Sequence, residues 1–306
     1  MTIDLHTALV YRPGTIEDSY AVFKVFEETL ADLSQRLGST TPTSWQDPAA
    51  LERMWAERRS LYEHLAQTAE QFWIAEQADQ VIGFSRSILQ DGVRELTELF
   101  VLPGVQSAGV GRELLTRAFP GEGARYRSII SSPDIPAQVL YLKIGVYPRF
   151  PIYYFGRKPE TTTASADLVY KPIVESIESL EILGSLDRSL LGYRRDATHG
   201  WLLSDRHGYL YYRDDRPVGY GYIGVRNGPF ALLEADDFPA VLAHAEHEAA
   251  EDGREFGLEV PMINRVAVDY LLARGFHIDS FIGLSMSDAP FGKFENYIVT
   301  SPPFFL

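Results

Sequence analysis

The stretch that decides the fold runs from residue 98 to residue 118. It reads Glu98-Leu-Phe-Val-Leu-Pro103, Gly104-Val105, Gln106-Ser-Ala-Gly-Val-Gly111 and Arg112-Glu-Leu-Leu-Thr-Arg-Ala118. An apolar strand therefore leads through a glycine-containing turn into a helix. The first amides of a helix have no intrahelical acceptor and lie at the positive end of the helix dipole, and glycines let an anion approach the backbone. The pattern predicts a site for a pyrophosphate group.

The composition limits the kind of protein to which this site can belong. The chain has 306 residues, 45% of them hydrophobic and 23% charged, which favours two globular domains. A net charge of −14 disfavours nucleic acid and anionic membranes as partners. Because cysteine is absent, a disulfide framework, a thiol nucleophile and a cysteine-based zinc site are excluded.

The N-terminal sequence Met1-Thr-Ile-Asp-Leu-His6 has no basic region followed by an apolar stretch. No window of the chain approaches the 18 or more apolar residues of a membrane span. We therefore expect a cytoplasmic protein without a membrane partner.

Apolar periodicity divides the chain into two similar halves. The first contains the capping-box sequence Thr15-Ile-Glu-Asp18, and Asp47-Pro48 marks the start of a second helix. Residues 159–176 have a linker composition, so we expect domains at 1–158 and 177–306. The expected fold class is mixed α/β (α+β), with two domains in tandem, each a central, mostly antiparallel sheet flanked by helices. Strands are expected near 8–11, 72–75, 81–85, 95–102, 127–131, 153–155, 209–212, 218–223, 230–234 and 255–260, and helices near 135–144, 177–191, 238–250 and 267–271.

Two motifs of the first half resemble those of the GNAT superfamily of acyl-CoA-dependent N-acyltransferases. The family's cofactor motif, Gln/Arg-x-x-Gly-x-Gly/Ala, corresponds to Gln106-Ser-Ala-Gly109-Val-Gly111. Its later helix motif corresponds to Asp134-Ile-Pro-Ala137-Gln-Val-Leu140-Tyr141-Leu-Lys143-Ile-Gly145-Val146. Asp134 replaces the usual Asn and Val146 the usual Phe, while the tyrosine is retained.

The resemblance implies acetyl-CoA as the cofactor and a direct transfer of its acyl group to an amine. Leu99 to Val101 would bind the pantetheine arm, and Val105 to Arg112 would hold the pyrophosphate. Tyr141 would protonate the coenzyme A thiolate, although its spacing with Ala137 and Ile144 also suits a core aromatic residue. The implied cofactor-binding residues are Leu99, Phe100, Val101, Val105, Gln106, Ser107, Ala108, Gly109, Val110, Gly111, Arg112, Ser132, Asp134, Tyr141 and Lys143.

Glu95 and Glu98 are the candidates for the general base. Their separation of three places them on opposite faces of a strand unless a bulge intervenes. Glu95 lies eleven residues before Gln106, a spacing at which some GNAT members have a catalytic glutamate. An alternative is that both are ordinary strand carboxylates and that water carries the proton.

The second half resembles a GNAT unit without its chemistry. The sequence Asn264-Arg-Val-Ala267-Val-Asp-Tyr270-Leu271 matches the later helix motif, but Leu271 stands where the first half has Tyr141. The sequence Glu234-Ala-Asp-Asp237 stands where a glycine loop is needed, and its carboxylates repel phosphate. We therefore expect a degenerate second copy. Its tyrosines at 209, 211, 212, 220 and 222 either fill a core or line an acceptor cleft between the copies.

His244 and His247 lie three residues apart, but no third ligand is evident and a solvated helix face is favoured, so no metal is expected. The leading interpretation is an N-acetyltransferase acting on a small amine or a peptide, as a monomer or a homodimer. The alternative is a non-catalytic sensor that binds acyl-CoA or a metabolite.

Overall fold

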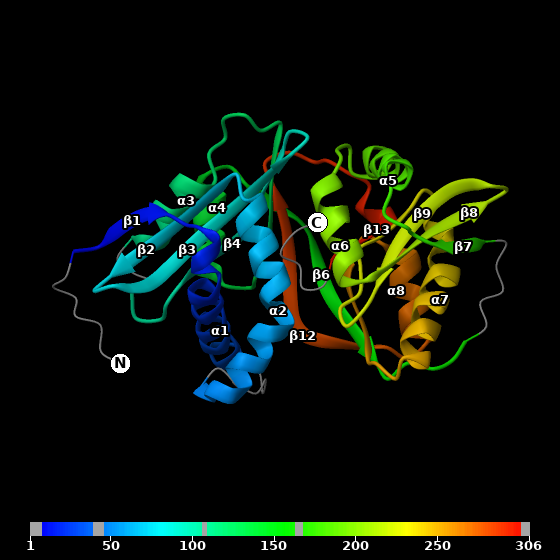
Figure 1. The fold of residues 1–306 in the computed structure, drawn as a ribbon, viewed down its shortest axis with the longest axis horizontal. Helices are drawn as coiled ribbons and strands as arrows, with labels where there is room; N and C mark the ends of the chain where they lie inside the picture. The colour runs from blue at the N-terminus through cyan, green and yellow to red at the C-terminus, as the bar shows by residue number, and fades with distance from the viewer. Residues whose placement is uncertain (1–7, 39–45, 106–108, 163–167, 301–306) are drawn as a thin grey trace. The chain divides into compact units, whose positions relative to one another are not determined.

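The computed structural model describes residues 8–38, 46–105, 109–162 and 168–300. Helices lie against mostly antiparallel sheets in both halves of the chain, which confirms the predicted fold class (Figure 1). None of the helices in these ranges combines the length and the apolar composition that crossing a bilayer requires. The backbone divides into two compact units. The first unit comprises residues 1–129 and 134–145, and the second unit comprises residues 130–133 and 146–306.

The first unit is built on strands in the order β1-β2-β3-β4-β5. Neighbouring strands are antiparallel except β4 and β5, which are parallel. Helices α1 and α2 lie in front of these strands in Figure 1, and α3 and α4 lie behind them. The elements are β1 (Val10–Pro13), α1 (Ser19–Arg36), α2 (Pro48–Thr68), β2 (Gln71–Gln77), β3 (Gln80–Gln90), β4 (Val93–Val101), α3 (Val110–Ala118), β5 (Tyr126–Ser131) and α4 (Ile135–Lys143).

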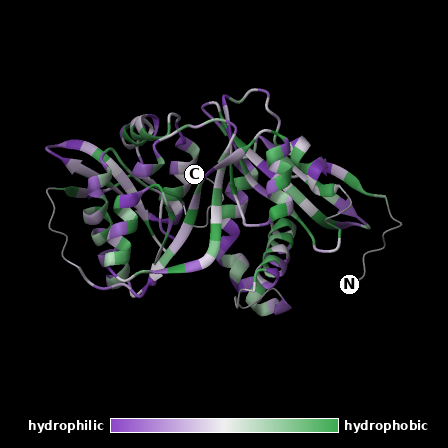
Figure 2. Ribbon diagram, turned by 180° about the vertical axis from the view of Figure 1, so that it is seen from behind, coloured by the Kyte–Doolittle hydropathy of each residue, from purple (hydrophilic) through white to green (hydrophobic). Residues whose placement is uncertain are grey.

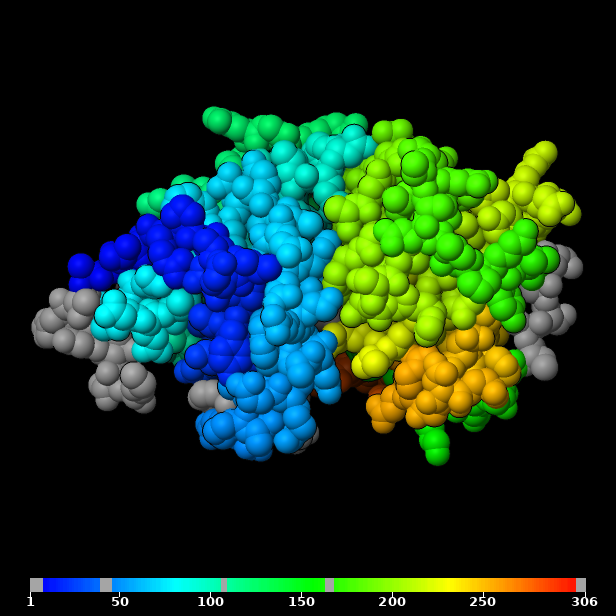
Figure 3. Space-filling view, viewed as in Figure 1, coloured from blue at the N-terminus to red at the C-terminus, as the bar shows by residue number. Residues whose placement is uncertain are grey.

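Helix α2 begins where the sequence indicates. The Asp47 carboxylate accepts a hydrogen bond from the Ala49 N–H at 3.0 Å, and Pro48 occupies the first turn, where its missing N–H is not needed. The helix lies on the surface of the first unit (Figure 3). Because its outer side faces solvent, it buries few side chains, mainly Leu61 and Tyr62 together with Leu65 in its C-terminal half.

The second unit contains two sets of hydrogen-bonded strands, β13-β10-β9-β8-β7 and β12-β6-β11, and every described pair in them is antiparallel. Its core joins apolar residues of both sets to helices α7 and α8. Figure 2 shows green apolar residues interspersed with white and purple polar residues along the strands and helices. The elements are β6 (Tyr147–Arg157), β7 (Val169–Pro172), α5 (Ile177–Leu190), α6 (Asp196–Asp205), β8 (His207–Arg213), β9 (Arg216–Ile223), β10 (Phe230–Leu232), α7 (Phe238–Glu251), β11 (Phe256–Pro261), α8 (Arg265–Ala273), β12 (His277–Ser287) and β13 (Tyr297–Ile298).

The division by contacts differs from the boundary expected at 159–176. The expected boundary places β6 in the first domain, but β6 pairs with β11 and β12, which come from the C-terminal half. The expected linker also contains β7, which pairs with β8. All four residues of β7 are exposed, so the strand has no buried alternation that the sequence could reveal.

A half-buried carboxyl group on β11 gives the second unit a predicted pH dependence. Burial, and then the charge of Asp279, raise the pKa of Glu259 from 4.5 to about 7. The folded protein therefore binds this proton more tightly than the unfolded chain, so the stabilisation is complete below about pH 4.5 and is lost as the pH rises through about 7. We expect Glu259→Gln to raise the free energy of unfolding by about 1–3 kcal/mol at pH 8 and by almost nothing at pH 4.

Urea denaturation at a series of pH values measures this difference, with the exposed Glu255→Gln as the control. If Glu259→Gln and the wild type lose stability in parallel between pH 4 and pH 8, the carboxyl of Glu259 is not the group responsible.

Candidate active site

The glycine turn ends at the start of α3. Gly109 has a φ of 83°, in the left-handed region, and a β-carbon at this position would meet no heavy atom within 4 Å. The N–H of Glu113 donates to the Gly109 carbonyl at 3.1 Å. The amides before Glu113 have no acceptor within the helix and lie at its positive end, where an anion is stabilised. The neighbouring Gln106, Ser107 and Ala108 of the expected cradle lie outside the described residues.

Strand β4 separates from β5 shortly before this turn. The parallel ladder ends with Leu96 opposite Ile129, whereas β3 pairs with β4 as far as Gly83 opposite Val101. Residues 98–101 therefore have a ladder partner in β3, and residues 97–101 have none in β5. This edge contains Leu99, Phe100 and Val101, the residues expected to bind the pantetheine arm, and its backbone can accept an extended ligand.

The end of β4, the start of α3 and helix α4 converge at Gly111. A β-carbon there would lie 3.7 Å from Val101 Cγ2 and 3.7 Å from Leu140 Cδ1. The structure therefore brings together the edge, the helix start and the helix that carries Tyr141. Of the other expected residues, Val105 and Val110 are buried, Ser132 is half-buried, and Arg112 and Lys143 are exposed.

Tyr141 lies on the buried side of α4 with 5% of its surface exposed. Burial, and then the charge of Asp134, raise the pKa of its phenol above the usual 10. The hydroxyl therefore keeps its proton at neutral pH. Asp134 caps α4 by accepting from the Ala137 N–H at 3.2 Å, and it also accepts from Arg36 at 3.1 Å.

Strand β4 contains a bulge between Glu95 and Glu98, the feature that decides whether the two side chains lie on the same face of the sheet. Glu95 lies opposite Ile88 and Glu98 lies opposite Arg86, with a register shift between the two pairs. Because Ile88 and Arg86 are two residues apart on β3, the two glutamates share one face of the sheet. Both are almost completely buried.

Glu98 forms an ion pair with Arg86, and neither side chain is exposed. Burial raises the pKa of Glu98, and the adjacent Arg86 acts against that shift. Arg86 also donates to the Tyr62 carbonyl at 3.0 Å and lies 5.0 Å from the centroid of the Phe72 ring. Glu98 is therefore held by a permanent cation, which leaves Glu95 as the better candidate for a base.

Sequence reasoning missed Arg86. It lies within the strand Val81-Ile-Gly-Phe-Ser-Arg86, where a charged side chain must find a partner if it is buried. Since Glu98 lies on the next strand of the predicted sheet, a search for carboxylates on neighbouring strands would have found the pair.

The second unit lacks these features at the corresponding places. Helix α7 begins directly after Asp237, whose carboxylate accepts from Arg213 at 2.5 Å. Leu271, the counterpart of Tyr141, is fully buried. Of the five tyrosines, those at 211, 220 and 222 are buried and those at 209 and 212 are half-buried, which favours the core interpretation for three of them.

His244 packs against aromatic residues. Its Nδ1 lies 3.0 Å from the Tyr211 hydroxyl, its ring stacks on Tyr170, and burial lowers its pKa to about 4. Across the described ranges, no cluster of three or more His, Asp or Glu side chains has the arrangement of a metal site.

The fold and this site define a mixed α/β protein with the start of a helix beside an open strand edge. Residues 68–146 match the acetyltransferase (GNAT) domain family. The first half of the chain thus contains a match to a GNAT acetyltransferase domain, and the chain as a whole shares its fold with tandem GNAT structures. No curated protein matches the chain.

Solved structures share this arrangement at low sequence identity. A candidate acetyltransferase from Pyrococcus horikoshii is 13% identical with a TM-score of 0.70, over 97% of this chain and 95% of that one. A GCN5-related N-acetyltransferase from Sphaerobacter thermophilus is 13% identical with a TM-score of 0.57, over 95% and 99%. A tandem GNAT protein from the clavulanic acid biosynthesis pathway is 14% identical with a TM-score of 0.56, over 92% and 99%. At these identities the likeness establishes the fold alone.

Proposed function

We propose that the first unit transfers an acetyl group from acetyl-CoA to a primary amine of a small molecule or a peptide. The observation that carries this proposal is the start of α3 beside the β4 edge that continues past its last partner in β5. An anionic diphosphate fits the helix start, and an extended amide-bearing arm fits the strand edge. The GNAT domain match supports the same cofactor class.

The residues of the site suit direct attack by the amine. Acetyl-CoA supplies the acyl group as a thioester, whose carbonyl can accept a hydrogen bond from the β4 edge. The amine nitrogen forms a bond to the carbonyl carbon while the carbon–sulfur bond breaks. Tyr141 donates its proton to the departing thiolate, and Glu95 or a water molecule takes the proton that the amine loses.

The net charge of −14 favours an acceptor that carries a positive charge before it is deprotonated. A sensor that only binds acyl-CoA is the second candidate, because Arg86 holds Glu98 in an ion pair and so only one of the two carboxylates, Glu95, could act as a base. Release of coenzyme A thiol with a panel of amines separates the two candidates, since a sensor releases none.

Two matched glycines test the pyrophosphate site. Gly109 and Gly192 both have a φ of 83°, and a β-carbon at either position would meet no heavy atom within 4 Å. An alanine at either position is therefore strained by about 1–2 kcal/mol without a clash. We expect Gly109→Ala to weaken coenzyme A binding about 5-fold in calorimetry, because the turn shifts the amides at the start of α3.

Gly192 lies in the second unit. Gly192→Ala should lower the unfolding midpoint about as much as Gly109→Ala does, but it should leave the affinity for coenzyme A unchanged. Equal affinities in all three proteins would place the pyrophosphate elsewhere, and no binding heat in the wild type would remove the proposed function altogether.

A further inference from the structure

The two halves of the chain run through the same order of elements. Residues 10–157 and residues 169–287 each contain a strand, two α-helices, three strands, an α-helix, a strand, an α-helix and a strand. Strands β10 and β11 of the second unit therefore correspond to β4 and β5 of the first unit, and helices α7 and α8 correspond to α3 and α4. This correspondence allows the space between β4 and β5 in the first unit to be compared with the space between β10 and β11 in the second unit.

In the first unit, β4 pairs directly with β5 over Val93–Leu96 and then continues without a β5 partner. In the second unit a different strand adjoins β10. Phe230 and Ala231 of β10 pair with Ile298 and Tyr297 of β13. The chain then continues to Val299, which forms a bridge with Glu259 of β11. The C-terminal segment thus lies between β10 and β11, where the first unit has an open strand edge.

Side chains hold this segment, here called the C-terminal plug (residues 294–300), from both sides. The Asn296 amide donates to the carbonyls of Leu232 and Leu233 at the end of β10, at 2.8 and 3.0 Å. The Asn264 amide donates to the Tyr297 carbonyl at 3.2 Å. Asn264 also caps α8, as Asp134 caps α4 in the first unit. Carbonyls that an extended ligand could contact are therefore already satisfied by the chain itself.

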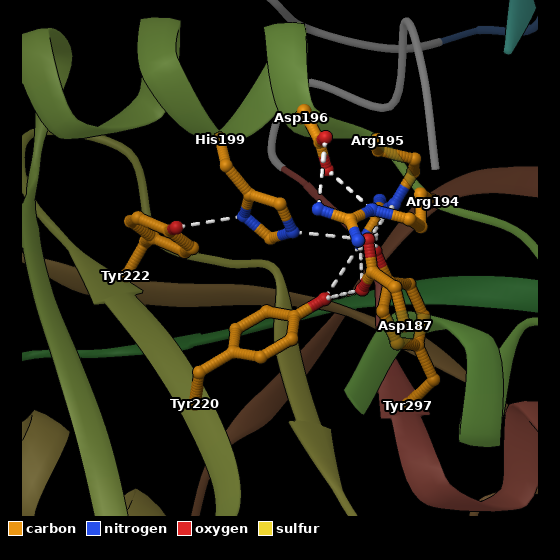
Figure 4. A network of polar contacts seen from close by, with 8 residues as sticks. All are labelled: Asp187, Arg194, Arg195, Asp196, His199, Tyr220, Tyr222 and Tyr297. Carbon is orange, nitrogen blue, oxygen red and sulfur yellow. Dashed lines mark hydrogen bonds and ion pairs between the residues drawn. The ribbon is translucent and has the colours of Figure 1, made fainter. Parts of the chain in front are cut away.

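A buried polar network fixes the plug at its tyrosine (Figure 4). Arg195 donates to the Tyr297 hydroxyl at 2.8 Å and to both oxygens of Asp187 at 3.0 and 2.9 Å. Although burial alone raises the pKa of Asp187, the adjacent Arg195 and His199 hold that pKa below its ordinary value. The carboxylate therefore stays charged. The network consists of Asp187, Arg195, His199, Tyr220, Tyr222 and Tyr297, all at most 1% exposed.

From these contacts we propose that the cleft of the second unit is a binding groove for an extended peptide, and that its ligand is the chain's own C-terminal plug. The groove pairs with the plug backbone through β10 and β11 and recognises two side chains, Asn296 and Tyr297. Because the plug occupies the place of a pantetheine arm, the second unit is closed to acyl-CoA. The expectation that one acyl-CoA binds per chain rests on the function proposed for the first unit. The proposal that the plug occupies a peptide groove does not depend on that function.

The plug can be separated from the chain after folding. A specific protease site replacing residues 290–292, in the connection between β12 and the plug, allows the folded full-length protein to be cut. We expect the fragment that begins at Lys293 to remain bound through gel filtration at micromolar concentration. Asn296→Ala and Tyr297→Phe should each weaken its retention at least 10-fold, because each removes a contact to the groove. The control is Glu295→Ala, an exposed residue of the same segment, which should change nothing.

Immediate loss of the fragment, or equal retention of all three variants, would overturn the proposal. Calorimetry of the cut protein with coenzyme A distinguishes this failure from a failure of the proposed function. One coenzyme A per chain, with the fragment still bound, agrees with both. If no coenzyme A binds while the fragment is retained, only the function proposed for the first unit is wrong. If two molecules of coenzyme A bind per chain, or if coenzyme A releases the fragment, the proposal for the plug is wrong.

Discussion

Arg86→Met is expected to lower the free energy of unfolding by about 3–5 kcal/mol, the largest loss of stability that we predict for a single residue. Arg86 and Glu98 are both fully buried, so the variant leaves an uncompensated carboxylate inside the first unit. Burial already raises the pKa of Glu98, and without Arg86 the carboxyl should bind a proton at a still higher pH. Urea denaturation of the full chain, with hydrogen exchange of the β3 and β4 amides as a local probe, measures the loss.

Two further variants distinguish a buried charge from simple loss of packing. The double variant Arg86→Met, Glu98→Leu should be more stable than Arg86→Met alone, because it removes both charges. Arg59→Met breaks a surface pair with Glu63 and should cost less than about 1 kcal/mol. If the double variant is less stable than the single one, Arg86 contributes mainly through contacts other than its ion pair.

The surroundings of Arg86 and Glu98 illustrate which features of the first unit could be predicted from the sequence and which could not. The helix start at Gly109 and the cap at Thr15 follow from local chemistry, and the Thr15 N–H indeed donates to Asp18 at 2.8 Å. The bulge in β4 does not follow, because it depends on contacts across strands. The Thr97 hydroxyl donates to the Arg86 carbonyl at 3.1 Å and the Ser85 hydroxyl to the Glu98 carbonyl at 3.0 Å.

In the second unit, sequence reasoning found the repeated pattern of elements but missed α6, β7, β12 and β13. Helix α6 lacks a strong apolar stripe, and β12 begins with four exposed residues, His277 to Ser280. Strand β13 has only two residues and pairs with β10, more than sixty positions earlier in the chain. Pairings at such separations leave no local periodicity, so only the assembled sheet reveals that the second cleft is occupied.

Tyr141→Phe is expected to lower turnover at least about 10-fold, the scale of general acid catalysis, with the affinity for coenzyme A unchanged. The substitution keeps the buried ring of α4 and removes only the hydroxyl. The raised pKa makes this phenol a weaker acid than a free tyrosine, so its proton should move only as negative charge develops on the thiolate beside it. The measurement is steady-state thiol release together with calorimetric binding of coenzyme A.

The pH dependence of turnover separates this role from a structural one. Because the pKa of Tyr141 lies above its ordinary value, the phenol stays protonated through neutral pH, and the wild type should show no alkaline limb from Tyr141 below about pH 10. In Tyr141→Phe, turnover should recover with acyl donors whose thiol leaving group is more acidic, since such a thiolate needs no proton to depart. Tyr147→Phe, an exposed tyrosine, serves as the control. A Tyr141→Phe enzyme with normal turnover and normal unfolding midpoint would assign the tyrosine to the core of the first unit and leave protonation of the thiolate to water.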